Sequence, residues 1–477
     1  MKRLISCVLA LLYIMAGFAS GTWILHGKEY RVDTLYHAYI GPGTTQTSIK
    51  LAGPVNLRVF YTTTDLKNEN VDVRAIKHKD TLTGLGTVSN AAESHSTSNR
   101  SYFAGINADF FSSSMPCGIT VVDGEVYCSD QASGWSLFGI DANKIPYSGG
   151  GDFYVKLTAP DYSTAELSAM NLERETNGLV LYSSRKGANT GTDGNGSEVV
   201  LIPDGEGNFL TPGATVRMRV QGNPNHAGSM PIPDNGYILS GSGTKESFVS
   251  NLSEGDEVEV RCAIRFNGFT GGKIQQALGG CPMLVSGGKV LDTENALDHL
   301  TSAQPRTAVG YNAEKNKLVM LVADGRSSIS VGPISKVLAD IMIYAGCSEA
   351  MNFDGGGSST FYVKGEGVIN QPSDGSERSV TDGLYLSTDA PQNDMTITTI
   401  RFMDYAKTLN QGDAYTPVIY GYNQYGVLVD RNVEGVTLSC GSSLGTITND
   451  GTTLNASGSG THMLTAGYGN LTTTLSV

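Results

Sequence analysis

The sequence predicts an α+β fold, with a large mixed-sheet domain that contains few helices and a small all-β sandwich after it. Three observations predict this class. Glycine contributes 59 of 477 residues, while hydrophobic residues make up 40% and charged residues 17%, a balance typical of turn-rich folded β proteins. Clear helical spacing is confined to one stretch, residues 334–345. From Met395 onward, short alternating apolar strands lie in a Thr-, Ser- and Gly-rich background.

The first 19 residues predict a secretory signal peptide. Lys2 and Arg3 precede the apolar run 4–18, and Gly17, Phe18 and Ala19 form a small-x-small pattern that predicts cleavage near Ala19. No later segment is apolar enough over a sufficient length to cross a bilayer. We therefore expect an extracytoplasmic protein, either periplasmic or secreted, without a transmembrane segment in the mature chain.

Charge and cysteine content limit the partners and the covalent framework. The formal net charge is −13, and no run of five basic residues occurs, which argues against nucleic acid as a partner. Six cysteines remain after the predicted cleavage, too few for a disulfide scaffold in a chain of this length. Cys117 and Cys128 flank an expected hairpin turn at Asp123 and Gly124, so we predict that these two cysteines pair.

The chain after the signal peptide divides into two predicted domains. Residues 22–388 form the large domain, and 387–393, which contain Pro391, form the linker. Residues 389–477 resemble a bacterial immunoglobulin-like β-sandwich, because period-two apolar spacing is broken by turn residues. A spacer or adhesion role is the simplest interpretation of this module.

The stretch from 306 to 363 has the most informative local pattern. It predicts two strands at 306–311 and 317–322, joined by the turn 312–316. A helix follows from Pro333, with apolar residues at helical spacing, and ends at Gly346. A strand at 350–354, a loop at 355–359 and a strand at 360–363 complete the stretch.

Polar residues follow the ends of these strands. If Tyr311 pairs with Lys317, Arg306 lies opposite Val322 and diagonal to Asp324, about 7 Å away on one face. The helical crossover makes the strands ending at Asp324 and Asp354 parallel in one sheet, so both carboxylates lie at the same edge. Ligands bind beyond such carboxyl ends.

The loop after Asp354 predicts an anion or sugar site. Gly355, Gly356 and Gly357 would let backbone N–H groups turn toward a ligand, and Ser358 and Ser359 add hydroxyl donors. A Walker loop is excluded, because no Gly-Lys-Ser/Thr follows. A second cluster ends the strand 102–106, where Asn107 and Asp109 share parity and are expected to face one cavity.

At these residues the sequence resembles the phosphodiester glycosidase family, the family of the uncovering-enzyme domain that removes N-acetylglucosamine from N-acetylglucosamine-phospho-mannose. Five segments carry the resemblance, in order: 107–111, 279–285, 306–310, 324–326 and 352–359. The likeness spans about 30–388. It implies a hydrolase that releases a sugar from a sugar 1-phosphodiester. We expect no cofactor and assign no metal-ligating residues.

The resemblance suggests a role for each matching residue. We expect Arg306, with Thr307 and the loop 355–359, to bind the phosphate. Asp354 and Asp324 would flank the anomeric carbon, one protonated and one ionised. Asn107 and Asp109 would position the sugar hydroxyls. The acid, the stereochemical outcome, the sugar and the alcohol beyond the phosphate stay open.

Three other classes of protein are alternatives to this hypothesis. The seven histidines are scattered without ligand spacing, which disfavours a zinc or two-metal phosphodiesterase, although a carboxylate-bound Mg or Ca ion near Asp354 stays open. No Gly-x-Ser-x-Gly elbow occurs within residues 22–388, which disfavours a serine hydrolase. A non-catalytic extracytoplasmic glycan-binding protein is the main alternative, and sugar release from a phosphodiester discriminates the two.

Overall fold

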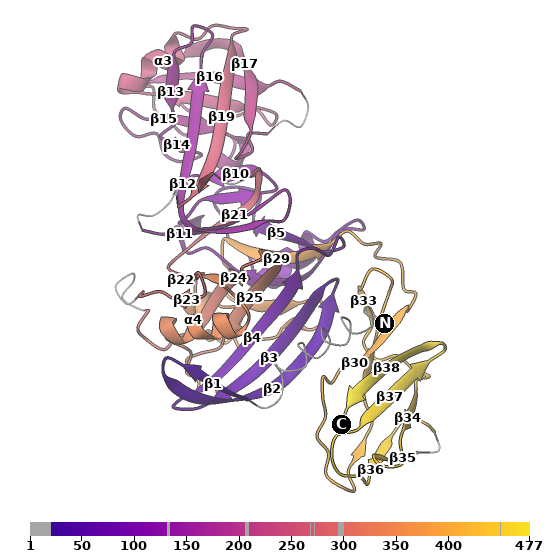
Figure 1. Ribbon diagram of the computed structural model, residues 1–477. Coiled ribbons are helices and arrows are strands. Elements are labelled where there is room, and N and C mark those ends of the chain that lie inside the picture. The colour runs from indigo at the N-terminus through magenta and orange to yellow at the C-terminus, as the bar shows by residue number, and fades with distance from the viewer. Residues whose placement is uncertain are drawn as a thin grey trace, which may run out of the picture.

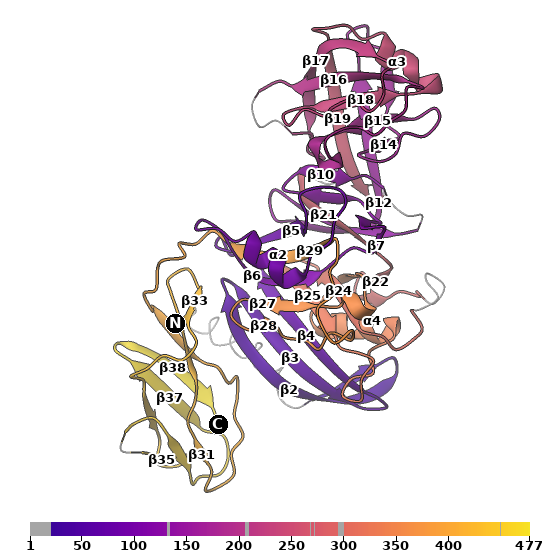
Figure 2. The same cartoon turned by 180° about the vertical axis from the view of Figure 1, so that it is seen from behind.

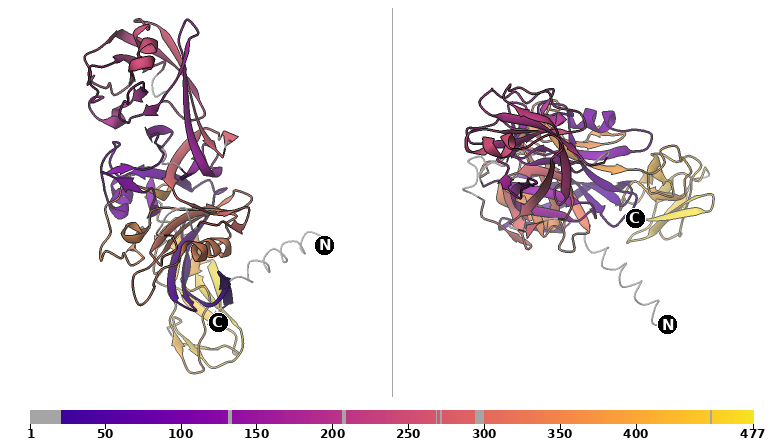
Figure 3. Two further views of the ribbon diagram at one scale, coloured as in Figure 1. Left: turned by 90° about the vertical axis from the view of Figure 1, so that its left-hand side faces the viewer. Right: turned by 90° about the horizontal axis from the view of Figure 1, so that it is seen from above.

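The computed structural model describes residues 21–477 apart from 131–133, 206–208, 268, 271, 294–299 and 449. The predicted signal peptide at 1–19 lies outside the described residues. The chain forms a row of three parts, with a β-rich lobe at one end, two packed sheets in the middle and the C-terminal module at the other end (Figures 1 and 3). No helix of the described part is long and apolar enough to cross a membrane.

The middle of the molecule contains an antiparallel sheet of nine strands within the described ranges. In sheet order these are β1 (Gly21–Leu25), β2 (Lys28–Gly41), β3 (Thr44–Ala52), β4 (Asn56–Asp65), β25 (Lys317–Ala323), β24 (Arg306–Tyr311), β26 (Glu349–Asn352), β22 (Met283–Ser286) and β23 (Lys289–Val290). β24 is antiparallel to both β25 and β26. The predicted parallel relation of the strands before Asp324 and Asp354 is therefore confirmed.

A second, five-stranded sheet packs against the first. Its strands, in order, are β28 (Gly367–Val368), β27 (Phe361–Val363), β6 (Ser101–Asn107), β29 (Asp382–Thr388) and β5 (Asp72–Lys77). Alternate residues of both sheets, such as Val309 and Ile106, share one buried cluster. The outer faces are covered by α4 (Ser335–Tyr344) and α2 (Val88–Ser94) respectively. The order helix, sheet, sheet, helix is visible in Figure 2.

The end lobe is built on the third large sheet. Its main path is β10 (Glu125–Cys128), β9 (Thr120–Val122), β21 (Ile274–Gly280), β11 (Ser136–Asp141), β12 (Pro146–Thr158), β19 (Glu257–Phe266), β17 (Thr215–Asn225), β16 (Ser197–Pro203), β18 (Tyr237–Gly241), β15 (Leu179–Tyr182) and β14 (Ala169–Met170). β13 (Thr164–Glu166) and β20 (Phe269–Thr270) pair at the side, and α3 (Glu246–Ser250) packs nearby.

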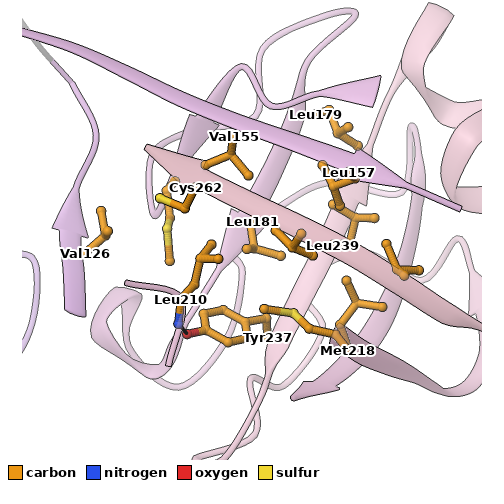
Figure 4. Close-up of a cluster of buried hydrophobic side chains, with 14 of the residues drawn as sticks. Val126, Val155, Leu157, Leu179, Leu181, Leu210, Met218, Tyr237, Leu239 and Cys262 are labelled. Carbon is orange, nitrogen blue, oxygen red and sulfur yellow. Dashed lines mark hydrogen bonds between the residues drawn. The ribbon is translucent and has the colours of Figure 1, made fainter. Parts of the chain in front are cut away.

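The sheet of the end lobe curls around its own apolar core. Figure 4 shows Val155, Leu157, Leu181 and Leu239 converging on this core, where the Tyr237 hydroxyl accepts a hydrogen bond from the Leu210 backbone. Such burial stabilises by about 25 cal/mol per Å² of apolar surface. The lobe therefore has its own core, and its strands β9, β11 and β21 contact the two-sheet part, which lies next to the lobe in Figure 1.

The C-terminal part is all-β and has a separate core. Its strands are β30 (Thr399–Phe402), β31 (Ala414–Tyr415), β32 (Ile419–Tyr422), β33 (Leu428–Asp430), β34 (Thr437–Cys440), β35 (Gly445–Ile447), β36 (Leu454–Ala456), β37 (Met463–Tyr468) and β38 (Leu471–Ser476). They form three small sheets around one buried cluster. The immunoglobulin-like class, and the domain boundaries at 22–388 and 389–477, stay predictions.

Comparison with the sequence gives three corrections. First, the described residues are mostly β, with short helices only, so the α+β class overstated the helical content. The predicted mixed sheet is wrong for the middle of the molecule, because all neighbouring strands of both sheets are antiparallel. Second, Cys117 and Cys128 are free thiols. The hairpin at Asp123 and Gly124 forms as predicted, but Cys128 pairs with Thr120 across it, and the Cys117 backbone is bonded to Phe110 outside the hairpin.

The third correction concerns the register of β24 and β25. Tyr311 pairs with Leu318, and Arg306 pairs with Ala323, one residue away from the expected pairing. The Asn312 side chain causes this longer turn, because its Oδ1 accepts from the backbone N–H groups of Asn316 and Lys317. A slip of one residue moves every side chain to the opposite face of the sheet.

Candidate active site

The ends of strands from both sheets meet at Asp354. Its backbone N–H donates to the Ala108 carbonyl (2.8 Å), directly beyond β6. On the other side, the Phe353 N–H donates to Thr307 O (2.8 Å) and the Gly356 N–H to Pro305 O (2.9 Å). These bonds bring Asp354, the segment that leads to Asp109 and the glycine loop together.

The side chains of Asn107 and Thr307 hold this junction together through hydrogen bonds. Asn107 is buried; its Nδ2 donates to Asp354 O (2.7 Å), and its Oδ1 accepts from the Thr307 hydroxyl (2.8 Å) and the Thr360 N–H (3.1 Å). The Thr307 hydroxyl also lies 3.2 Å from Ser359 Oγ. These side chains are therefore engaged with the protein, and their geometry suits positioning of the loop better than direct contact with a sugar.

The glycine loop differs from the expected ring of free amides. Residues Gly356–Ser358 form a 3-10 turn, and the N–H groups of Gly356, Ser358 and Ser359 donate to backbone carbonyls. Gly356 has φ 59°, which favours glycine. A Cβ at Gly357 would lie 2.0 Å from Arg378 Nη2. Glycine is needed here because a guanidinium packs directly on the backbone.

Two arginines that the sequence did not single out lie over this loop. Arg378 donates from Nη1 to the buried Ser358 hydroxyl (3.3 Å) and is paired with Asp374 (2.6 Å). Arg326 donates to the neutral side chains of Gln304 and Ser373, and its Nη2 would be 3.0 Å from a Cβ at Gly356. Both side chains are exposed, so they supply positive charge on the solvent side of the loop that follows Asp354.

Asp354 is the accessible carboxylate of the junction. It is only partly buried. Burial raises its pKa to about 6, while hydrogen bonding from Ser358 and the positive charge of Arg378 act in the opposite direction. A carboxyl group with this pKa changes its protonation state near neutral pH, as acid–base catalysis requires.

Behind Asp354 lies a buried pair of acids. Asp109 is 1% exposed; its Oδ2 accepts from the Gly118 N–H (2.9 Å), and its Oδ1 has no hydrogen-bond partner within the described residues. Its pKa is raised well above the usual value, by burial and then by the charge of Asp382. Asp382 also has a raised pKa because of burial, opposed by Lys77, its cross-strand neighbour. This environment favours the protonated form of Asp109.

Asp324 lies at the same end of the sheet but in a closed environment. It is 5% exposed, and its Oδ1 accepts from the Gln371 N–H (2.9 Å) and Asn370 Nδ2 (3.3 Å). Burial raises its pKa. Asn370 in turn donates to Ser359 O and accepts from the Phe361 N–H. Asp324 thus supports the strand that follows the glycine loop.

The expected position of Arg306 is wrong. The side chain is 1% exposed and lies on the helix side of β24, where Nη2 donates to Ser302 O (2.9 Å) and Nε to Pro333 O (3.3 Å). Burial, and secondarily Arg326, lowers the pKa of the guanidinium to about 10. This follows from the register, since Ala308, two residues on, packs against the α4 cluster. Arg306 therefore holds the segment before β24 and the start of α4.

Sequence reasoning missed Arg378 and Asp382 and gave Arg326 no role. Arg378 follows the loop by twenty residues, in a segment without strand or helix spacing, so no local pattern pointed to it. Asp382 opens β29 and would have needed the pairing of β29 with β6 to be known. Among the described residues, no group of three or more His, Cys, Asp or Glu side chains is arranged to hold a metal ion.

Comparisons with known proteins agree with this region. The model of the phosphodiester glycosidase family matches residues 212–387. That range contains four of the five resembling segments and excludes 107–111. The SPbeta prophage-derived uncharacterized protein YomE of Bacillus subtilis (strain 168) is 40% identical over 88 residues, which cover 18% of this chain and 13% of that protein.

Two solved structures share the fold at low sequence identity. A putative exported protein from Burkholderia pseudomallei K96243 has a TM-score of 0.56 at 18% identity, covering 78% of this chain and 99% of that one. A hypothetical protein from Synechocystis has a TM-score of 0.56 at 15% identity, covering 72% of this chain and 62% of that one. The family match thus covers the part that contains Asp354 and the glycine loop.

Proposed function

We propose that the protein is an extracytoplasmic hydrolase that cleaves a sugar from a sugar 1-phosphodiester at Asp354. The observation that carries the proposal is the partly exposed Asp354, with a pKa of about 6, beside two exposed arginines on a glycine loop. The family match over 212–387 supports the same chemistry. The substrate would be a carbohydrate phosphodiester of a glycan or surface polymer.

In this proposal, Arg326 and Arg378 bind the phosphate. A phosphodiester carries one negative charge, and cleavage at the sugar side converts it into a phosphate monoester with additional charge. Guanidinium groups stabilise such developing charge through charge-assisted hydrogen bonds. Arg326 hydrogen-bonds to the neutral Gln304 and Ser373, so it is the better candidate for the charge itself, and Arg378, paired with Asp374, for orientation.

Asp354 would act at the anomeric carbon in its ionised form. The bond between that carbon and the phosphate oxygen breaks, the water oxygen bonds to the carbon, and the water proton passes to Asp354. The leaving phosphate monoester is a weak base and needs charge stabilisation more than a proton. Asp109, buried next to Asp354 in its favoured protonated form, would add no second negative charge to the site.

A panel of sugar 1-phosphodiesters tests this proposal. The purified protein should release free reducing sugar and a phosphate monoester in equal amounts from at least one member. Sugar 1-phosphates serve as the control substrates, because a monoesterase would attack them. Binding to the panel without release over days would support the glycan-binding alternative instead.

A further inference from the structure

A cavity of about 590 Å³ lies at the base of the end lobe, outside the residues discussed so far. Its walls come from β11, β12 and the segments after β10 and β13. The polar and aromatic residues that line it include Asp130, Trp135, Ser136, Asp152, Phe153 and Ser168. The volume lies within the range of small-molecule sites, about 300–1,000 Å³.

A chain of short contacts connects this cavity with Asp354. Asp354 is bonded to Ala108, which precedes Asp109. Asp109 packs against Gly279, where a Cβ would lie 2.6 Å from Oδ2. The next residue, Gly280, pairs with Ser136 of the cavity wall. Phe110, which follows Asp109, contacts Trp135 with ring centroids 5.0 Å apart.

The cavity and the arginines are connected to Asp354 through different elements. Beside the glycine loop, Arg326 is held by Gln304, which lies just before β24, and by Ser373. Arg378 is held by Asp374. The cavity is reached through Asp109 and β21. A substrate with its phosphate on Arg326 and Arg378 and its anomeric carbon at Asp354 would therefore extend its sugar toward Phe110 and Trp135.

The lining has the chemistry of a sugar site. Trp135 is partly exposed and makes an edge-to-face contact with Phe110. The exposed part of the indole can contact the C–H groups of a sugar ring. Serine hydroxyls and carboxylates can bind sugar hydroxyls. Asp152 is paired with Arg265 (2.6 Å), which lowers the attraction of this wall for a cation.

We propose that this cavity binds the part of the sugar donor beyond the ring attached to the phosphate. The substrates would then be oligosaccharyl phosphodiesters, with at least a second sugar residue next to Trp135. This inference rests on the proposed function for the direction of the substrate, whereas binding of a glycan to the cavity can be measured without catalysis.

Trp135 itself reports on binding, because the chain has two tryptophans. The other, Trp23, stacks on Tyr344 in a distant part, and Trp23→Phe leaves Trp135 as the single indole. We expect chitobiose or maltose to change its emission at concentrations at least tenfold below those needed for N-acetylglucosamine or glucose. Equal responses to mono- and disaccharides, or no response to either disaccharide, would overturn the proposal. This readout is independent of hydrolysis, so its failure is distinct from failure of the proposed function.

Kinetics on two substrates complete the test. With N-acetylglucosaminyl and chitobiosyl methyl phosphodiesters, Trp135→Ala should lower kcat/KM at least tenfold for the disaccharide and less than twofold for the monosaccharide. Ser168→Leu, which narrows the cavity and keeps the indole, should show the same selective loss. Tyr162→Ala removes an aromatic ring that is 87% exposed and is the matched control. An equal loss on both substrates would show a merely structural role and contradict the proposal.

Discussion

Asp324 and Asp354 occupy equivalent places in the fold, yet their surroundings differ. Each follows a strand of the nine-stranded sheet, each precedes a glycine, and the two strands are parallel. Asp324 is enclosed by Asn370 and the Gln371 backbone. Asp354, by contrast, is partly exposed, and two arginine side chains lie next to the loop that follows it. Burial raises the pKa of both. A shifted pKa alone therefore does not identify a catalytic group; access and the neighbouring charges do.

Replacing each aspartate by asparagine gives the largest contrast. Asp354→Asn removes the proton acceptor, and we expect turnover to fall by about 10³-fold, within the usual range for a general acid or base. Asp324→Asn keeps an Oδ1 acceptor for Gln371, so turnover should fall by less than about tenfold. Initial rates of sugar release at pH 7.5 measure both. Equal losses of turnover in the two variants would contradict a catalytic role for Asp354 and a structural one for Asp324.

A second contrast compares an exposed arginine with a buried one. Arg326→Met should lower kcat/KM by about 10²-fold with little change in the free energy of unfolding, since it removes the positive charge that lies beside the glycine loop. Arg306→Met should instead lower the free energy of unfolding by about 2–4 kcal/mol, because buried carbonyls lose their donors. Urea unfolding monitored by circular dichroism, combined with kinetics, separates the two effects. A folded, stable Arg306→Met protein with lost phosphate affinity would restore Arg306 to the site.

These contrasts also show how far the sequence predicts this molecule. The helix at 334–345, the parallel strands before Asp324 and Asp354, and the hairpin at Asp123 and Gly124 follow from local periodicity and turn chemistry, and the structure confirms them. The face of Arg306 could not be predicted, because one extra residue in the turn at Asn312 reverses it.

Long-range pairing accounts for the other differences. Arg378 and Asp382 reach the site only through the docking of the segment after β28 and the pairing of β29 with β6. The end lobe also supplies Trp135 and Ser136 across β21, which no local pattern in residues 112–270 indicated. The part of the junction at Asp354 that neighbouring strands form could be predicted from the sequence. The part that segments distant in sequence contribute could not.

The pH dependence gives the smallest of the three effects. The pKa of Asp354 is raised to about 6, so the group is ionised above that pH and protonated below it. Because the ionised form is the active one in this account, kcat/KM should be constant above pH 7 and fall about tenfold per unit below pH 6. A profile of kcat/KM between pH 4.5 and 8.5 measures this. Activity that falls as the pH rises through 6 would instead make Asp354 the proton donor.

Hydrolysis in ¹⁸O-labelled water tests most directly whether the bond at the anomeric carbon is the one that breaks. Attack at that carbon leaves the original oxygen on the phosphate, so mass spectrometry of the phosphate monoester should find no ¹⁸O above the level of an enzyme-free control. Incorporation of one ¹⁸O atom into the phosphate monoester would show cleavage at phosphorus, and Asp354 would then belong to a phosphodiesterase and not to a glycosidase.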